Sequence, residues 1–174
     1  PDGAMTLVET VEDVAALSPA NPDSLGFLTQ TTLSVDDTNE IVEALKVRFP
    51  SIQGPRGEDI CYATSNRQQS VKAIVPDCDK MIVIGSPNSS NSQRLAEVAR
   101  RSGVPSELVE RADEVDFGWL EGVRTLGITA GASAPEVLVR ELVDHLATRF
   151  TVTERQVETT VETMSFKLPR GLAA

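Results

Sequence analysis

The chain repeats one pattern four times: an apolar, strand-like run, then a loop of hydroxyl and amide residues, then a helical period. The apolar runs are residues 25–28, 59–63, 81–85 and 125–129. The run at 81–85, Met-Ile-Val-Ile-Gly, is continuously apolar, which is typical of a parallel strand buried on both faces. Strands that alternate with helices in this way form βαβ units. The pattern therefore predicts an α/β fold class, with parallel sheets flanked by helices.

The polar loops of this pattern are candidate anion sites. They are residues 29–34, 64–66, 86–92 and 130–135, and each opens a predicted helix. Ligands of open α/β sheets bind at the carboxyl ends of the strands, so we expect all the loops to meet at one sheet edge. A helix N-terminus offers unpaired N–H groups and partial positive charge, and so it holds an anion without lysines. Residues 89–92, with Ser133 as their partner, are the strongest candidates for binding a phosphate or diphosphate, although capping alone explains any single loop.

Charge and cysteine content exclude several classes of protein. The 174 residues include 26 acidic and 16 basic side chains, for a net charge of −10. Nucleic-acid and membrane-surface binding need clustered cations, so neither is expected. No apolar run approaches the roughly 20 residues of a membrane-spanning helix, and no signal peptide is recognisable. Two cysteines do not make a disulfide framework, so a cytoplasmic location is expected.

Breaks in the periodicity divide the chain. Pro and Gly at residues 54–57 mark the boundary of two lobes, which predicts one α/β lobe over 1–57 and another over 58–150. Residues 106–123 form an acidic connector with a short strand or helix near Leu108. The tail, 151–174, contains a possible edge strand at 165–168. Ser34 and Asp37 have the spacing of a capping box, which places a helix start between them.

Four single residues carry possible chemistry. Cys61 precedes a helix N-terminus, where a thiolate is stabilised, so it is a nucleophile, a metal ligand or a buried inert cysteine. Cys78 lies just before the third strand and is better explained as structural. His145 falls inside the last helix, away from the polar loops, so no Ser-His-Asp set is available. Trp119, in the connector, is interpreted as a packing residue.

Four longer segments, taken together, resemble one family. They are residues 29–38 (TQTTLSVDDT), 59–68 (DICYATSNRQ), 85–92 (GSPNSSNS) and 129–136 (TAGASAPE). In this order and spacing they are similar to the 4-hydroxy-3-methylbut-2-enyl diphosphate reductases of the LytB type, which end the non-mevalonate isoprenoid pathway. The likeness extends to residues 1–9 and 166–169 and so covers essentially the whole chain.

This resemblance implies a reaction and a set of roles. The family's enzyme reduces an allylic alcohol diphosphate to isopentenyl and dimethylallyl diphosphates and loses water. A [4Fe–4S] cluster on three cysteines carries the electrons, which a ferredoxin or flavodoxin supplies. By motif, Cys61 corresponds to one cluster ligand, and Thr31 to the hydroxyl that contacts the substrate alcohol and relays a proton. The diphosphate ligands implied are Ser89, Ser90, Asn91 and Ser133.

The chain also departs from the family. The family's first half does not match any part of it, including two cluster cysteines, the diphosphate-binding histidines and the proton-donating glutamate. The resemblance therefore implies about one and a half lobes of a three-lobed fold, with an incomplete second lobe over 1–57 and the third lobe over 58–150. We expect that this part alone neither holds the cluster nor turns over. Self-association is expected to cover the exposed faces. The alternative is a non-redox α/β module that binds phosphate or diphosphate.

Overall fold

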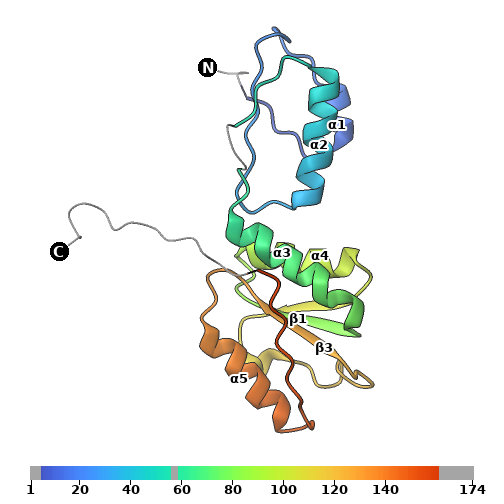
Figure 1. The fold of residues 1–174 in the computed structure, drawn as a ribbon, viewed down its shortest axis with the longest axis vertical. Helices are drawn as coiled ribbons and strands as arrows, with labels where there is room; N and C mark the ends of the chain where they lie inside the picture. The colour runs from blue at the N-terminus through green and yellow to red at the C-terminus, as the bar shows by residue number, and fades with distance from the viewer. Residues whose placement is uncertain (1–4, 56–58, 161–174) are drawn as a thin grey trace, which may run out of the picture.

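The computed structural model describes residues 5–55 and 59–160. Its elements fall into two groups with separate cores, which lie at opposite ends of an elongated molecule (Figure 1). We call residues 5–55 the N-terminal unit and residues 59–150 the C-terminal unit. The lobe boundary expected after residue 57 falls among residues that the structure does not describe, so the division at that residue stays a prediction.

The C-terminal unit is built on a three-stranded parallel sheet with strand order β2-β1-β3. The strands are β1 (Lys80–Ile84), β2 (Ser106–Val109) and β3 (Leu126–Ala130). Met81 of β1 is aligned with Ser106 on one side and with Gly127 on the other. The central strand is therefore the continuously apolar run, as its composition predicts, and the connector contributes a strand rather than a helix.

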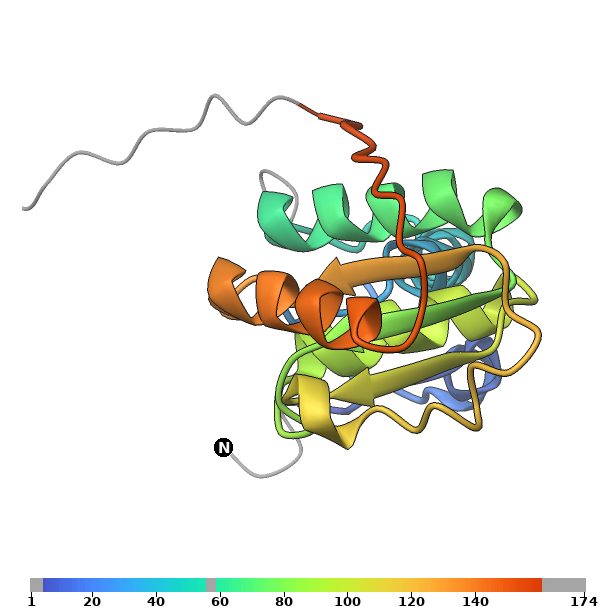
Figure 2. The same ribbon diagram turned by 90° about the horizontal axis from the view of Figure 1, so that it is seen from below.

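Helices cover both faces of this sheet (Figure 2). On one face lie α3 (Tyr62–Ile74) with the 3₁₀ turn η1 (Val75–Asp77), and α4 (Ser90–Arg101). On the other face lie α5 (Glu136–Ala147) and the turn η2 (Ala112–Glu114). The α/β fold class expected from the sequence is confirmed for this unit.

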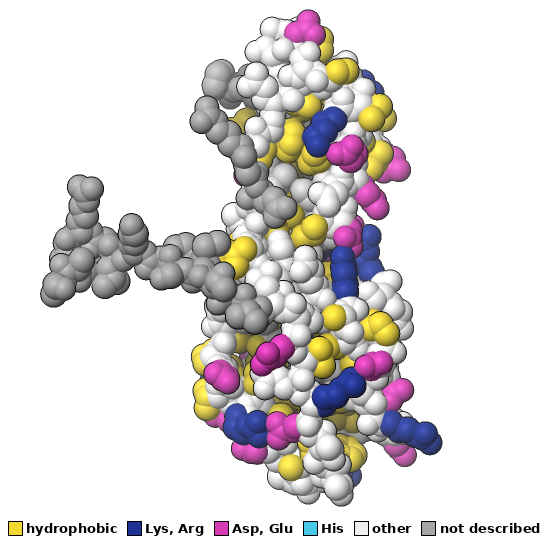
Figure 3. All heavy atoms as spheres, viewed as in Figure 1, with side chains coloured by type: hydrophobic (Ala, Val, Ile, Leu, Met, Phe, Trp, Pro, Cys, Tyr) yellow, Lys and Arg dark blue, Asp and Glu magenta, His cyan; other side chains and the backbone are white. Residues whose placement is uncertain are grey.

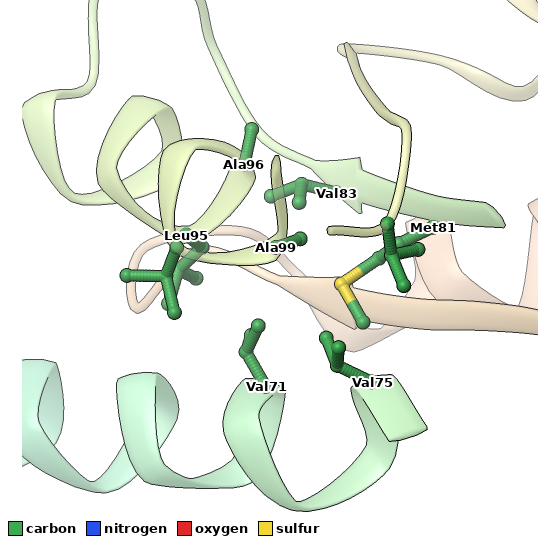
Figure 4. Packing of buried hydrophobic residues seen from close by; sticks show 9 residues of the cluster. Val71, Val75, Met81, Val83, Leu95, Ala96 and Ala99 are labelled. Atoms are coloured by element: carbon green, nitrogen blue, oxygen red, sulfur yellow. The ribbon is translucent and has the colours of Figure 1, made fainter. Parts of the chain in front are cut away.

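Alternation along β1 separates the two halves of the core. Met81 and Val83 point toward α3 and α4, where they pack with Val71 and Leu95 (Figure 4). Ile82 and Ile84 belong to the cluster on the opposite face, around Leu142 of α5. Because successive strand side chains point to opposite faces, a strand covered on both sides must be apolar throughout.

The N-terminal unit is smaller and has little sheet. It contains α1 (Val11–Ala16) and α2 (Val35–Arg48), which pack around Val14, Leu45 and Phe49. The strand expected at 25–28 is reduced to one parallel bridge, Gly26 to Gln53. That expectation was wrong because the segment finds only this single partner, and Leu28 is 87% exposed.

The second expected strand, at 59–63, was also wrong. Helix α3 already begins at Tyr62, so the polar triplet 64–66 lies inside the helix instead of forming a loop. The reason is a helical stripe: Thr64, Gln68 and Val71 are buried at spacings of four and three residues. Two of these three residues are polar, so a search for apolar residues alone does not detect the period.

The remaining segments confirm smaller expectations. The Ser34 hydroxyl accepts from the Asp37 amide at the start of α2, which is half of the expected capping box. His145 is half-buried, and its ring lies 4.9 Å from that of Phe117, while Trp119 packs beside the same cluster.

Residues 151–160 run back over the C-terminal unit, where Glu154 pairs with Arg140 and Arg155 pairs with Asp77. The strand expected at 165–168 lies outside the described residues.

Candidate functional site

The first turn of α4 is seated between two glycines at the carboxyl edge of the sheet. A Cβ atom on Gly85, which follows β1, would lie 2.2 Å from the Ser92 Oγ. A Cβ atom on Gly131, which follows β3, would also lie 2.2 Å from that Oγ. Ser92 itself is 1% exposed. Only glycine at both strand ends lets the helix N-terminus approach the sheet this closely.

Two serines fix the start of this helix. The Ser89 Oγ accepts from the Ser92 amide at 3.3 Å and from the Ser92 hydroxyl at 3.1 Å. Ser89 is therefore the N-cap, and the capping explanation holds for its hydroxyl. The first turn of α4 contains no acidic residue, so the partial positive charge of the helix N-terminus is not offset there.

Asn91 is the unusual residue of this turn. It is 7% exposed, and within residues 5–55 and 59–160 neither its Oδ1 nor its Nδ2 has a hydrogen-bond partner. A buried amide without partners is costly, by about 1–3 kcal/mol per group, and is rare in folded proteins. The Nδ2 lies 3.7 Å from the Cβ position of Gly131, so this amide adjoins the loop that contains Ser133.

A loop of the N-terminal unit reaches the same turn. The Thr32 and Ser90 hydroxyl oxygens are 2.9 Å apart and share a hydrogen bond. Thr31, the preceding residue, is exposed, and its carbonyl accepts from the Cys61 amide at 3.0 Å. The loops at 29–34 and 86–92 thus converge although they belong to different units. The expected cause was wrong for this pair, because the first loop follows no strand of the sheet, and the two loops meet through the packing of the units.

Cys61 lies at the start of α3. It is the N-cap residue, its side chain makes no capping hydrogen bond, and its thiol is exposed. The alternative of a buried inert cysteine is therefore wrong for Cys61. Cys78 behaves differently, because its Sγ–H donates to the Ile74 carbonyl at 3.1 Å and burial raises the pKa of its thiol.

Charged pairs hold the two units together beside the site. At the start of α2, Asp36 pairs with Lys72 of α3 at 2.6 Å. Asp37 pairs with Arg101 of α4, and the hydrogen bond from that guanidinium lowers the pKa of the Asp37 carboxyl. The Arg94 Nη1 lies 3.9 Å from the same carboxylate. In these pairs acidic and basic side chains neutralise each other locally. On the face shown in Figure 3, acidic and basic side chains are interspersed.

The donor set for a metal cluster is incomplete among the described residues. Within 5–55 and 59–160, no three His, Cys, Asp or Glu side chains gather into a group able to hold a metal ion. Cys61 offers one exposed thiol without a side-chain hydrogen bond at the helix start, so it fits the role of a single cluster ligand. A complete cluster site does not fit these residues alone.

The structure places the expected site residues in two neighbouring groups. Thr31 adjoins Cys61, while Ser90 and Asn91 lie at the α4 N-terminus with their neighbour Ser89. Ser133 is exposed in the loop after β3, two residues beyond Gly131, whose Cβ position lies 3.7 Å from the Asn91 Nδ2. Sequence reasoning missed Thr32 and Gln68, which connect the two units. The adjacent threonines at 31 and 32 were the available signal for the first of them.

Comparison with known proteins identifies the family. The family described as "LytB protein" matches residues 2–147. The chain belongs to the LytB family. A LytB relative from Phenylobacterium zucineum (strain HLK1), named 4-hydroxy-3-methylbut-2-enyl diphosphate reductase, is 59% identical over 99% of this chain and 55% of its own length. A relative of the same name from Ruegeria pomeroyi is 56% identical, again over 55% of its length.

A solved structure agrees with this assignment. The E-1-hydroxy-2-methyl-but-2-enyl-4-diphosphate reductase from Plasmodium falciparum matches 94% of this LytB chain and 52% of its own, with a TM-score of 0.86 and 35% identity. The chain thus spans about half the length of the relatives it matches. Within the described residues, no helix has the length and apolar character needed to cross a bilayer.

Proposed function

We propose that this LytB chain forms the diphosphate-binding part of a 4-hydroxy-3-methylbut-2-enyl diphosphate reductase. The proposed reaction adds two electrons and two protons to the allylic alcohol diphosphate, breaks its C–O bond, and releases water with isopentenyl or dimethylallyl diphosphate. The activity is proposed for the protein at the full length of its relatives, because the chain spans about half of them.

The unpartnered amide of Asn91 is the observation on which the diphosphate site rests. An Nδ2 donor, a helix N-terminus without acids and the hydroxyls of Ser90 and Thr32 all lie at one sheet edge. A diphosphate oxygen would give the buried amide its missing acceptor, and the helix end would balance its charge. We assign Ser133, in the adjoining loop, as a further hydroxyl donor, while Ser89 acts mainly by capping α4.

We assign Thr31 and Cys61 to the reacting end of the substrate. The exposed Thr31 hydroxyl would donate to the substrate alcohol and pass a proton to the departing oxygen. Cys61 would supply one thiolate ligand of a [4Fe–4S] cluster, with the other ligands outside this chain. When bound, that cluster supplies the electrons, received from a ferredoxin or flavodoxin. The Cys61 N–H to Thr31 carbonyl bond keeps these two residues adjacent.

The test is reduction of the substrate by the full-length protein, purified without oxygen and supplied with a low-potential reductant. Asn91→Ala removes the proposed diphosphate donor, so we expect the KM to rise about 10- to 100-fold, as for loss of one hydrogen bond to a charged group. Asn88→Ala is the matched control, because Asn88 lies in the same loop and is exposed. An unchanged KM in Asn91→Ala would leave that residue without a binding role.

The second candidate is a non-redox module that binds phosphate or diphosphate. It is favoured by the same Asn91 site together with the incomplete metal-ligand set among the described residues. One experiment distinguishes the two candidate functions. Inorganic diphosphate binding without iron and without turnover in the full-length protein supports the module, whereas bound iron with substrate reduction supports the reductase.

A further inference from the structure

We propose that Gln68 is a positioning residue, which holds the Thr31 loop in a fixed relation to Cys61. The inference deepens the proposed function and rests on it, because it concerns the distance between the substrate-contacting hydroxyl and the proposed cluster ligand. Gln68 touches neither the substrate nor a cluster in this scheme. It acts through the backbone of the loop.

The side-chain amide of Gln68 makes two hydrogen bonds across the junction between the units. Its Nε2 donates to the Leu33 carbonyl at 2.8 Å, and its Oε1 accepts from the Val35 amide at 3.1 Å. Because the Leu33 carbonyl can only accept and the Val35 amide can only donate, the Gln68 side-chain amide has a single favourable orientation. Gln68 is 1% exposed, which shields both bonds from competition with water.

Helix α3 and its N-cap residue therefore bind both ends of the loop segment 31–35. At the helix start, the Cys61 amide donates to the Thr31 carbonyl at 3.0 Å. Gln68 follows seven residues later, two turns along the same helix face, and binds the chain at Leu33 and Val35. The segment 31–35 is thus fixed at three backbone atoms to one rigid helix, and Thr31 has little freedom to move relative to Cys61.

The identity of the residue also indicates a positioning role. Position 68 lies on the buried stripe of α3 between Thr64 and Val71, where an aliphatic side chain would fill the same space but leave the Leu33 carbonyl and the Val35 amide without these hydrogen bonds. A buried amide stabilises the fold only when both its bonds are made, and it then fixes one arrangement of its partners. Glutamine at this position therefore specifies the loop geometry in addition to filling space.

Gln68→Met tests the proposal, because methionine has a similar length and no amide. Gln69→Met is the matched control, since Gln69 is the neighbouring residue of the same type and is exposed. In the full-length reductase we expect Gln68→Met to lower kcat about 10- to 100-fold, the scale for misplacement of a reacting group, with KM changed less than about twofold. Asn91→Ala is expected to do the reverse, with a raised KM and a kcat that changes less.

A second readout does not depend on turnover. We expect hydrogen exchange of the Cys61 amide to quicken about tenfold in Gln68→Met, although Gln68 does not contact that amide. An unchanged kcat per bound cluster, with unchanged exchange at Cys61, would overturn the positioning role and leave Gln68 as a stabilising residue only. A wild-type protein that cannot reduce the substrate would instead overturn the proposed function, and the exchange at Cys61 would still decide whether Gln68 fixes the loop.

Discussion

At the residue scale, the two cysteines of this chain differ in exposure and in hydrogen bonding. Cys61 is exposed at a helix start, while Cys78 is half-buried, donates to the Ile74 carbonyl and packs against the core. In the full-length protein we expect Cys61→Ser to lose bound iron and cluster absorbance, because a hydroxyl is a poor replacement for a thiolate ligand. Cys78→Ser serves as the control and should keep its iron. Anaerobic iron and sulfide analysis of both variants makes the comparison, and a full iron content in Cys61→Ser would exclude the ligand role.

A glycine at the site gives a second prediction at this scale. Gly131→Ala would place a Cβ atom 2.2 Å from the Ser92 Oγ, on a turn held by the N-cap bonds of Ser89. We expect a loss of about 1–3 kcal/mol in the free energy of unfolding, because overpacking here displaces the start of α4. Gly26→Ala is the control, since its nearest neighbour is the Gln53 carbonyl oxygen at 3.4 Å. Urea unfolding of the two variants measures this loss. Equal unfolding midpoints would contradict the close packing of the α4 N-terminus against the two glycines.

At the scale of elements, sequence patterns predicted the structure where the buried positions of an element are apolar. The run at 81–85 became β1, and the helical period after residue 135 became α5. The pattern predicted the body of α3 but not its start, because the buried stripe there contains Thr64 and Gln68, which a search for apolar periods does not count. The same failure hid Gln68 as a connecting residue. Its partners are backbone atoms more than thirty positions away, and a local pattern contains no information about them.

The candidate site shows the same limit. Short polar motifs predicted Ser90 and Asn91, because helix starts are local features that Ser and Asn mark. That Thr32 meets Ser90 follows from the packing of two units, and the sequence separation of 58 residues gives no local sign of it. The family resemblance supplied the roles of Thr31 and Cys61, but the exposed thiol and the Thr31 carbonyl contact came from the structure.

The ion pairs between α2 and α4 give a pH prediction for these elements. Arg101 lowers the pKa of Asp37, so the charged carboxylate is stabilised in the folded state. The contribution of this group to stability is therefore present above about pH 4, the ordinary pKa of an aspartate, and is lost as the pH falls through the lower folded value. Asp37→Asn should be less stable than the wild type at pH 7 by roughly 0.5–1 kcal/mol and should lose part of the acid dependence.

Asp36→Asn is the comparison for this pair. Asp36 also pairs across the junction, but its side chain is 57% exposed against 33% for Asp37, so solvent screens the charge of Asp36 more strongly. Unfolding by urea at several pH values and at two salt concentrations measures both variants. Equal acid dependence in Asp37→Asn and the wild type would show that this carboxylate does not link folding to pH.

At the scale of the whole molecule, two cores of unequal size meet through a polar junction. The N-terminal unit has three buried hydrophobic residues, whereas both faces of the sheet in the C-terminal unit are covered. Hydrogen bonds and ion pairs between side chains connect them, among them Thr32 with Ser90 and Asp37 with Arg101. The self-association expected from the sequence stays a prediction, which sedimentation of the 174-residue chain at several concentrations would test.

This asymmetry predicts that the N-terminal unit opens before the sheet does. Leu45→Ala removes part of a core formed by only three buried hydrophobic residues, so the helix α2 should lose its amide protection while β1 keeps it. Val83→Ala instead weakens the central strand, and protection should fall in both units together, because the loop at 31–35 is anchored on α3. Native-state hydrogen exchange read by mass spectrometry distinguishes the two patterns. If Leu45→Ala lowers protection equally in α2 and β1, the units form one cooperative body, and the junction through Gln68 and Asp37 then transmits stability as well as geometry.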